Sequence, residues 1–211
     1  MKRSFVHLLL PIALMACNSE KKDTAGDAPV AATTKVDSAH EPLDTAATNK
    51  AWAAYMSPGK VHQLMAKSNG KWNAEMSFYQ TPGGAPSIYQ ASTVNQMILG
   101  GRYQKSTYKG MMDGMPFEGE SITAYDNARK IYISTWIDNM GTGMMYLEGT
   151  YHEATQTITF KGKATDVTTG KDFKTRETLK FVDDNTQLME MFDEKDGKEA
   201  KTMAIKLTRA K

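Results

Sequence analysis

The chain has 211 residues, a single cysteine and a formal net charge of +2. One cysteine excludes an intramolecular disulfide and a cysteine-rich zinc site. A charge this close to zero argues against a dedicated nucleic-acid binder, which normally carries a large basic excess. With 40% hydrophobic and 24% charged residues, the composition is that of a globular chain.

The N-terminus has the pattern of a secretory signal peptide. Lys2 and Arg3 precede an apolar run of about a dozen residues, which is too short for a bilayer core that needs about 20. The next residues, Leu14-Met15-Ala16-Cys17, resemble the lipobox of bacterial lipoproteins. We therefore expect residues 1–16 to be removed and Cys17 to be lipidated. The protein would then be anchored to a membrane of the bacterial cell envelope, on its periplasmic face or at the cell surface. The alternative is a plain signal peptide with an incidental cysteine.

The segment after the cysteine has the composition of a tether. Residues 18–48 contain no aromatic residue, no isoleucine and no methionine, and they are rich in alanine and threonine. Such a segment cannot bury enough apolar surface to offset its conformational entropy. We predict a disordered tether over residues 17–48, followed by a single domain over 49–211.

Two short helices are predicted at the start of the domain, between about residues 49 and 68. Trp52, Tyr55 and Met56 have helical spacing. Ser57-Pro58 is typical of an N-cap followed by proline at the first position of a second helix. Asn69-Gly70 suits the end of that helix.

From Gly70 onward, apolar residues alternate with period two, which indicates β-strands. Shared faces are formed by Trp72, Ala74, Met76 and Phe78, by Ile131, Ile133 and Ile137, and by Met203, Ile205 and Leu207. Regular turn signals separate these runs, so we expect about ten strands in one antiparallel meander. Closure into a barrel would remove two exposed edges, with the helices capping one open end. An open, strongly curled sheet is the alternative. The predicted class is mainly β.

Five segments carry a resemblance to a known family. They are Tyr55-Met56-Ser57-Pro58-Gly59, residues 97–103 (MILGGRY), 115–119 (MPFEG), 125–127 (YDN) and 134–143 (STWIDNMGTG). They resemble the bacterial family called domain of unknown function 1579, from about Trp52 to the C-terminus. The resemblance implies a barrel similar to lipocalins. It implies no reaction, so it transfers no catalytic residue.

Motifs of catalysis and metal binding do not stand out in this chain. It contains no GxSxG elbow, P-loop, HExxH or dinucleotide fingerprint. Beyond residue 16 the histidines are His40, His62 and His152, without the spacing of a zinc site. The acidic run 193–199 suits a hairpin turn better than a calcium loop, because Lys195 stands where a ligand is needed. We therefore expect no cofactor, no metal and no catalytic residue that can be named.

The leading hypothesis is a non-enzymatic barrel that binds a small apolar or amphipathic ligand. Thirteen of the fifteen methionines lie beyond residue 16, and flexible thioethers suit either a core or an adaptable pocket. Candidate lining residues, with Arg102 as a polar anchor, are Trp72, Tyr103, Phe117, Trp136 and Met145. Glu177 and Glu190 alternate with apolar residues, so they either face the interior or point outward past a bulge.

Two other functions remain open at this stage. One is a structural or interaction protein with a solid core, which would act through its outer surface. The other is a hydrolase-type enzyme, which would need convergent carboxylates such as Glu118, Glu177 or Glu190 beside an arginine. The membrane, through the lipid anchor, and the ligand are the expected partners. Nucleic acid is not expected, and the oligomeric state is not predicted.

Overall fold

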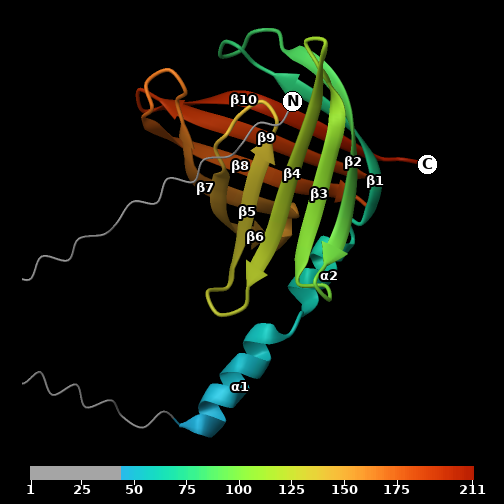
Figure 1. The fold of residues 1–211 in the computed structure, drawn as a ribbon, viewed down its shortest axis with the longest axis vertical. Helices are drawn as coiled ribbons and strands as arrows, with labels where there is room; N and C mark the ends of the chain where they lie inside the picture. Colours follow the sequence, from blue (N-terminus) through green and yellow to red (C-terminus); the bar gives the residue numbers. More distant parts are fainter. Residues whose placement is uncertain (1–43) are drawn as a thin grey trace, which may run out of the picture. The chain divides into compact units, whose positions relative to one another are not determined.

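In the computed structural model, which describes residues 44–211, ten strands form one closed antiparallel barrel (Figure 1). The strands follow one another around the barrel in chain order, and β1 closes the sheet by pairing with β10. The predicted mainly β fold, the barrel closure and the strand number are thereby confirmed. The signal peptide, Cys17 and most of the tether lie outside the described residues.

The elements follow one another with short connections. They are α1 (Thr45–Met56), α2 (Lys60–Ala66), β1 (Gly70–Phe78), β2 (Ser87–Ile98), β3 (Tyr103–Met112), β4 (Met115–Asp126), β5 (Ile131–Asp138), β6 (Met145–His152), the 3₁₀ turn η1 (Glu153–Thr155), β7 (Thr157–Thr165), β8 (Asp172–Asp183), β9 (Thr186–Lys195) and β10 (Lys198–Arg209).

The helix boundaries differ from the prediction. α1 begins at Thr45, so the tether predicted to extend to residue 48 overlaps its first turn. Asp44 caps this helix by accepting hydrogen bonds from two backbone amides. Ser57 ends α1, and Gly59 is the N-cap of α2. The Gly59 amide donates to Nδ1 of His62 over 3.0 Å. His62, at the third position of the helix, therefore accepts from the N-cap amide, whereas the sequence suggested that the Ser57 side chain would accept from amides inside the helix.

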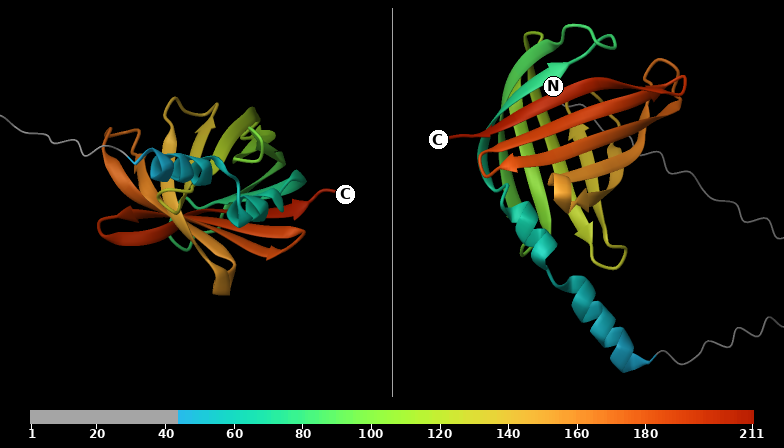
Figure 2. Two further views of the ribbon diagram at one scale, coloured as in Figure 1. Left: turned by 90° about the horizontal axis from the view of Figure 1, so that it is seen from below. Right: turned by 180° about the vertical axis from the view of Figure 1, so that it is seen from behind.

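α2 and the turn after it close one end of the barrel (Figure 2). His62 and Met65 of α2 are buried. The Trp72 indole donates to the Ser68 carbonyl over 2.8 Å, and the Gln187 amide donates to the Ser68 hydroxyl over 2.7 Å. We call this the plugged end, and we call the opposite end, with the β1–β2, β3–β4 and β5–β6 connections, the loop end.

α1 does not take part in this closure, although both helices were expected to cap the barrel. None of its residues is buried. Its hydrogen bonds to the barrel come from the Asn127 side-chain amide, which donates to the carbonyls of Ala54 and Tyr55 and, just after the helix, of Ser57. Of the helices within residues 44–211, none is long and apolar enough to cross a membrane.

Alternation places large apolar side chains inside the barrel. Trp72, Ala74 and Met76 of β1 are buried, together with Ile205 and Leu207 of the neighbouring β10. In β5 the inner positions are those of Tyr132, Ser134 and Trp136, so the face that carries the three isoleucines is the outer one. β-Branched residues on the outer face favour the strand conformation without filling the interior.

Arg209 is expected to stabilise the plugged end. Its guanidinium lies 4.2 Å from the centre of the Trp72 ring and donates to the carbonyls of Lys67, Asn69 and Asp184 at 2.7–3.0 Å. We expect Arg209→Ala to lower the free energy of unfolding by about 2 kcal/mol, because hydrogen bonds that involve a charged group contribute about 1.5–3 kcal/mol. Urea denaturation measures the change. The control Lys206→Ala, at an exposed position of the same strand, is expected to stay within about 0.5 kcal/mol. Equal losses in both variants would contradict this role of Arg209.

Candidate functional site

The barrel encloses a cavity of about 320 Å³ that extends to the loop end. One side, the polar wall, carries short hydroxyl and amide side chains from β2 to β5: Asn95, Gln104, Ser106, Ser121, Thr123 and Ser134. The other side, the apolar wall, comes from β1, β9 and β10: Met76, Phe78, Met189, Met191, Met203, Ile205 and Leu207. Towards the loop end the strands of the polar wall contribute Tyr108, Met112, Phe117 and Trp136 instead, and β9 adds the amide of Gln187. The polar wall is therefore the part of its side nearest the plugged end.

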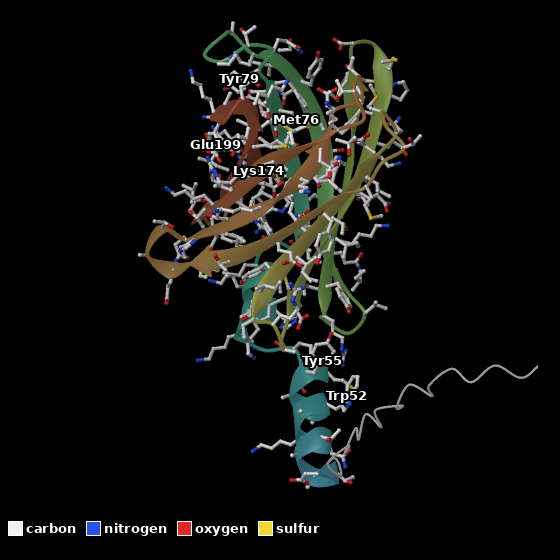
Figure 3. All side chains as sticks on the ribbon, turned by 90° about the vertical axis from the view of Figure 1, so that its left-hand side faces the viewer. Trp52, Tyr55, Met76, Tyr79, Lys174 and Glu199 are labelled. Carbon is white, nitrogen blue, oxygen red and sulfur yellow. The ribbon has the colours of Figure 1, made fainter. Side chains whose placement is uncertain are left out.

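Aromatic residues line the cavity towards the loop end. The Trp136 indole donates to the Asp138 carboxylate over 2.7 Å. Its ring stacks on Phe117 with 6.4 Å between centres and meets Tyr108 edge-on at 5.3 Å. Met76, labelled in Figure 3, lies in this same half of the barrel. The hydrogen bond and the two ring contacts hold the indole in one orientation against the cavity.

Gly119 provides the space for that indole. A Cβ atom at this position would lie 2.4 Å from the Trp136 ring, which is closer than van der Waals contact allows. We expect Gly119→Val to displace the indole and to lower the free energy of unfolding by about 1–3 kcal/mol, as overpacking does. Tryptophan fluorescence and urea denaturation measure the two effects. Gly143→Val is the control, because a Cβ there meets no atom within 4 Å. An unchanged emission spectrum in Gly119→Val would contradict the packing.

Methionine is the commonest residue in the lining. Seven methionines contribute: Met76, Met112, Met140, Met145, Met189, Met191 and Met203. Unbranched thioether side chains change rotamer easily and adapt to the shape of what they contact. A methionine-rich lining is therefore suited to ligands that vary in shape.

Glu177 places a carboxyl group in this cavity. It lies at the middle of β8, with Phe160 of β7 and Met191 of β9 as its inward partners on the adjacent strands. Its side chain is 5% exposed, and among residues 44–211 no hydrogen-bond donor or cation offsets the effect of its burial. Burial raises the pKa of Glu177 from its usual 4.5 to about 7. A carboxyl group in apolar surroundings is costly to ionise unless a partner reaches it.

The polar wall also contains an acceptor without a partner. Asn95 is 5% exposed, and within the described part of the chain its Oδ1 atom accepts no hydrogen bond. The two other amide side chains of the lining are already engaged, because Gln104 donates to the Met65 carbonyl and Gln187 to Ser68. Asn95 Oδ1 is thus a buried acceptor without a partner beside the cavity, and Glu177 is the carboxyl group that burial leaves without a counter-charge.

The structure brings together four of the residues proposed from sequence. Phe117, Trp136, Met145 and Glu177 all line the cavity. Trp72 does not line it, because its ring is 1% exposed and packs in the core near the plugged end.

Arg102 and Tyr103 lie elsewhere, and Arg102 is no polar anchor for this cavity. Both residues are exposed and line a second hollow of about 270 Å³ beside α1. Trp52 and Tyr55 of α1, labelled in Figure 3, line the same hollow.

Glu190 points to the outer surface of the barrel. Its carboxylate forms an ion pair with Lys201, close to the Phe192 ring that Arg176 covers at 4.0 Å. Leu188 and Phe192 of β9 lie on this same outer face. The alternation of Leu188, Glu190 and Phe192 therefore marks the outer side of β9 and not its inner side. Figure 3 labels Lys174 and Glu199, which belong to this charged surface.

The carboxylates needed for a paired-acid site are not gathered. Glu118 forms a 3.0 Å ion pair with Lys109 at the surface, and its side chain is 61% exposed. Glu190 is paired outside the barrel, so Glu177 has neither of them nearby. Within the described residues, no three histidine, cysteine or acidic side chains form a group able to hold a metal ion.

The family follows from a comparison with family models. The model described as "Protein of unknown function (DUF1579)" matches residues 57–209. The chain belongs to the DUF1579 family. No curated protein matches it. The matched range of this DUF1579 protein begins directly after α1 and ends with β10. The family unit therefore contains α2 and the whole barrel with its cavity, and leaves α1 outside.

Sequence reasoning missed the polar wall of the DUF1579 barrel. Ser106, Ser121 and Ser134 occupy inner positions, whereas residues such as Lys105 and Ile122 alternate with them on the outside. Polar residues on an inner face look like solvent-facing residues in a period-two pattern. The strand register around the closed barrel is the information that separates the two.

Proposed function

We propose that this DUF1579 protein is a lipid-anchored binding protein of the bacterial cell envelope, and that its barrel holds a small amphipathic ligand. The carrying observation is the cavity of about 320 Å³ between an apolar and a polar wall. That volume lies at the lower end of small-molecule pockets, which span about 300–1,000 Å³. An interior that holds one small ligand is the arrangement of lipocalins, and similarity to them is part of the proposal.

Side-chain size supports a ligand over a solid core. Ser106, Ser121 and Ser134 are short residues at positions where larger side chains would fill the interior. Ten strands also enclose a wider interior than eight, which leave room for side chains alone or for one small ligand. Hydroxyl groups and apolar side chains that face each other across a space match a ligand with one polar and one apolar part.

A lipid anchor would keep this barrel at a membrane. Acyl chains on Cys17 would each bind the bilayer with about 0.8 kcal/mol per buried CH₂. Mass spectrometry of the protein extracted from its own membrane is expected to find a mature N-terminus at Cys17 that carries acyl chains. Cys17→Ser is expected to move the protein into the soluble fraction. A mature chain that begins elsewhere and lacks acyl groups would contradict the anchor.

Ligand binding is tested by filling the cavity. Ser121 faces the cavity, whereas its neighbour Ile122 pairs with Lys105 and Thr135 on the outer face. We expect decanol to bind the natural protein in calorimetric titrations and to lose at least tenfold in affinity in Ser121→Phe. Ile122→Phe, the matched control, is expected to bind decanol like the natural protein. Failure of decanol and related decyl compounds to bind the natural protein would contradict the function, as would equal binding by Ser121→Phe.

A further inference from the structure

The charged groups of the cavity all have the same sign. Of the described residues that line it, Asp138 and Glu177 carry carboxyl groups, and the lining contains no lysine, arginine or histidine. Asp138 is already satisfied, because its carboxylate accepts from the Trp136 indole and from the Met140 amide. The cavity therefore offers a ligand a negative group but no positive one.

Glu177 is the group left for a ligand to contact. Its neighbours on the flanking strands, Phe160 and Met191, are uncharged. The titratable group that faces it from across the barrel is Tyr108 of β3, the strand opposite β8 in the circular order. Burial, with a smaller contribution from Glu177, raises the pKa of Tyr108, so this phenol stays neutral. No described side chain supplies the positive charge that would stabilise an ionised Glu177.

We propose that the cavity selects amphipathic ligands whose polar end donates hydrogen bonds, with primary amines preferred over alcohols and carboxylates excluded. An ammonium group would pair with the Glu177 carboxylate inside the barrel, where a charge-assisted hydrogen bond is strong. The apolar part of the ligand would lie against the methionines of the apolar wall. This inference rests on the proposed function.

A carboxylate ligand would meet the opposite situation. A second carboxylate near Glu177 would be repelled, or one of the two groups would have to take up a proton. A carboxylate that leaves water needs a cation or strong hydrogen-bond donors, and Arg102, the arginine expected for that purpose, lies outside this cavity. The charge of the lining is thus expected to favour amines over carboxylates that have the same apolar part.

The experiment compares three ligands that differ only in the polar end: decylamine and decanoate below their critical micelle concentrations, and decanol below its solubility limit. Calorimetric titrations are made at pH 8 with the natural protein, Glu177→Gln and the control Glu190→Gln. Glu190 is a glutamate paired with Lys201 on the outer surface. We expect the natural protein to bind decylamine at least tenfold more tightly than decanol, and decanoate more weakly than either. Glu177→Gln is expected to lose at least tenfold in affinity for decylamine but not for decanol, and Glu190→Gln to match the natural protein.

The pH dependence gives a second readout. Because decylamine needs the ionised form of Glu177, its affinity is expected to rise about tenfold from pH 5.5 to 8 in the natural protein and to stay level in Glu177→Gln. Decanoate binding as tightly as decylamine, or an unchanged amine affinity in Glu177→Gln, would overturn the ligand class while leaving the proposed function intact. Failure of all three compounds to bind would instead overturn the proposed function.

Discussion

Replacing Trp72 by alanine is expected to lower the free energy of unfolding by about 3–5 kcal/mol, the range for large aromatic residues in cores. The ring is 1% exposed, packs beside Ala74 and Leu207, and carries the Arg209 guanidinium on one face. Its indole N–H also holds the Ser68 carbonyl, which joins the barrel wall to the turn after α2. The substitution therefore removes apolar packing and a buried hydrogen bond together.

The chain contains a matched control for this measurement. Trp52 of α1 is 57% exposed, and α1 has no buried residue. Trp52→Ala is expected to change stability by less than about 0.5 kcal/mol. Urea denaturation of both variants, followed by circular dichroism, compares them on the same scale. A loss of under about 1 kcal/mol for Trp72→Ala would contradict the placement of this ring in the core.

Glu177→Gln is expected to stabilise the empty protein at pH 8. The folded-state pKa of about 7 lies above the usual 4.5, so the folded protein binds a proton that the unfolded chain releases. Stability from this group is therefore fully present below pH 4.5 and is lost as the pH rises through 7. The difference between the two pKa values corresponds to about 3 kcal/mol. Glutamine cannot ionise, so the variant avoids this loss.

The measurement is the difference in unfolding free energy between the natural protein and Glu177→Gln at several pH values from 4.5 to 8.5. Other titrating groups cancel in this difference. We expect the variant to gain up to about 3 kcal/mol on the natural protein as the pH rises, with most of the change between pH 4.5 and 7.5. Parallel stability curves would show that Glu177 is not buried as an isolated carboxyl group. Stabilisation by removing a charge is typical of sites where function opposes stability.

The barrel could be predicted from sequence because its physical signals are local. Regular turns and period-two alternation, as in Trp72, Ala74 and Met76, indicate strands whatever their partners. The closure of β1 against β10 follows from the cost of two free edges in a long meander. The start of the second helix was harder to predict, because Ser57-Pro58 looks like an N-cap whereas Gly59 is the N-cap of α2 and its amide donates to His62.

The site could be predicted only in part, because the strand register decides which face of each strand lines the cavity. Glu177 and Glu190 look alike in sequence, each alternating with apolar residues. The structure places Glu177 in the cavity and Glu190 on the surface with Lys201. The difference comes from β9, whose outer face also carries apolar residues. One of them is Phe192, whose ring is covered by the Arg176 guanidinium. Period two identifies two faces of a strand but not which one is inside.

The most direct test of an acid-lined ligand cavity is a ¹³C NMR titration of the Glu177 carboxyl, with and without saturating decylamine. The assignment follows from the signal missing in Glu177→Gln. Without ligand, we expect Glu177 to titrate near pH 7, as its burial requires. With decylamine bound, the midpoint should fall by at least one pH unit, because the ammonium group stabilises the carboxylate. The same midpoint in both titrations would contradict the account.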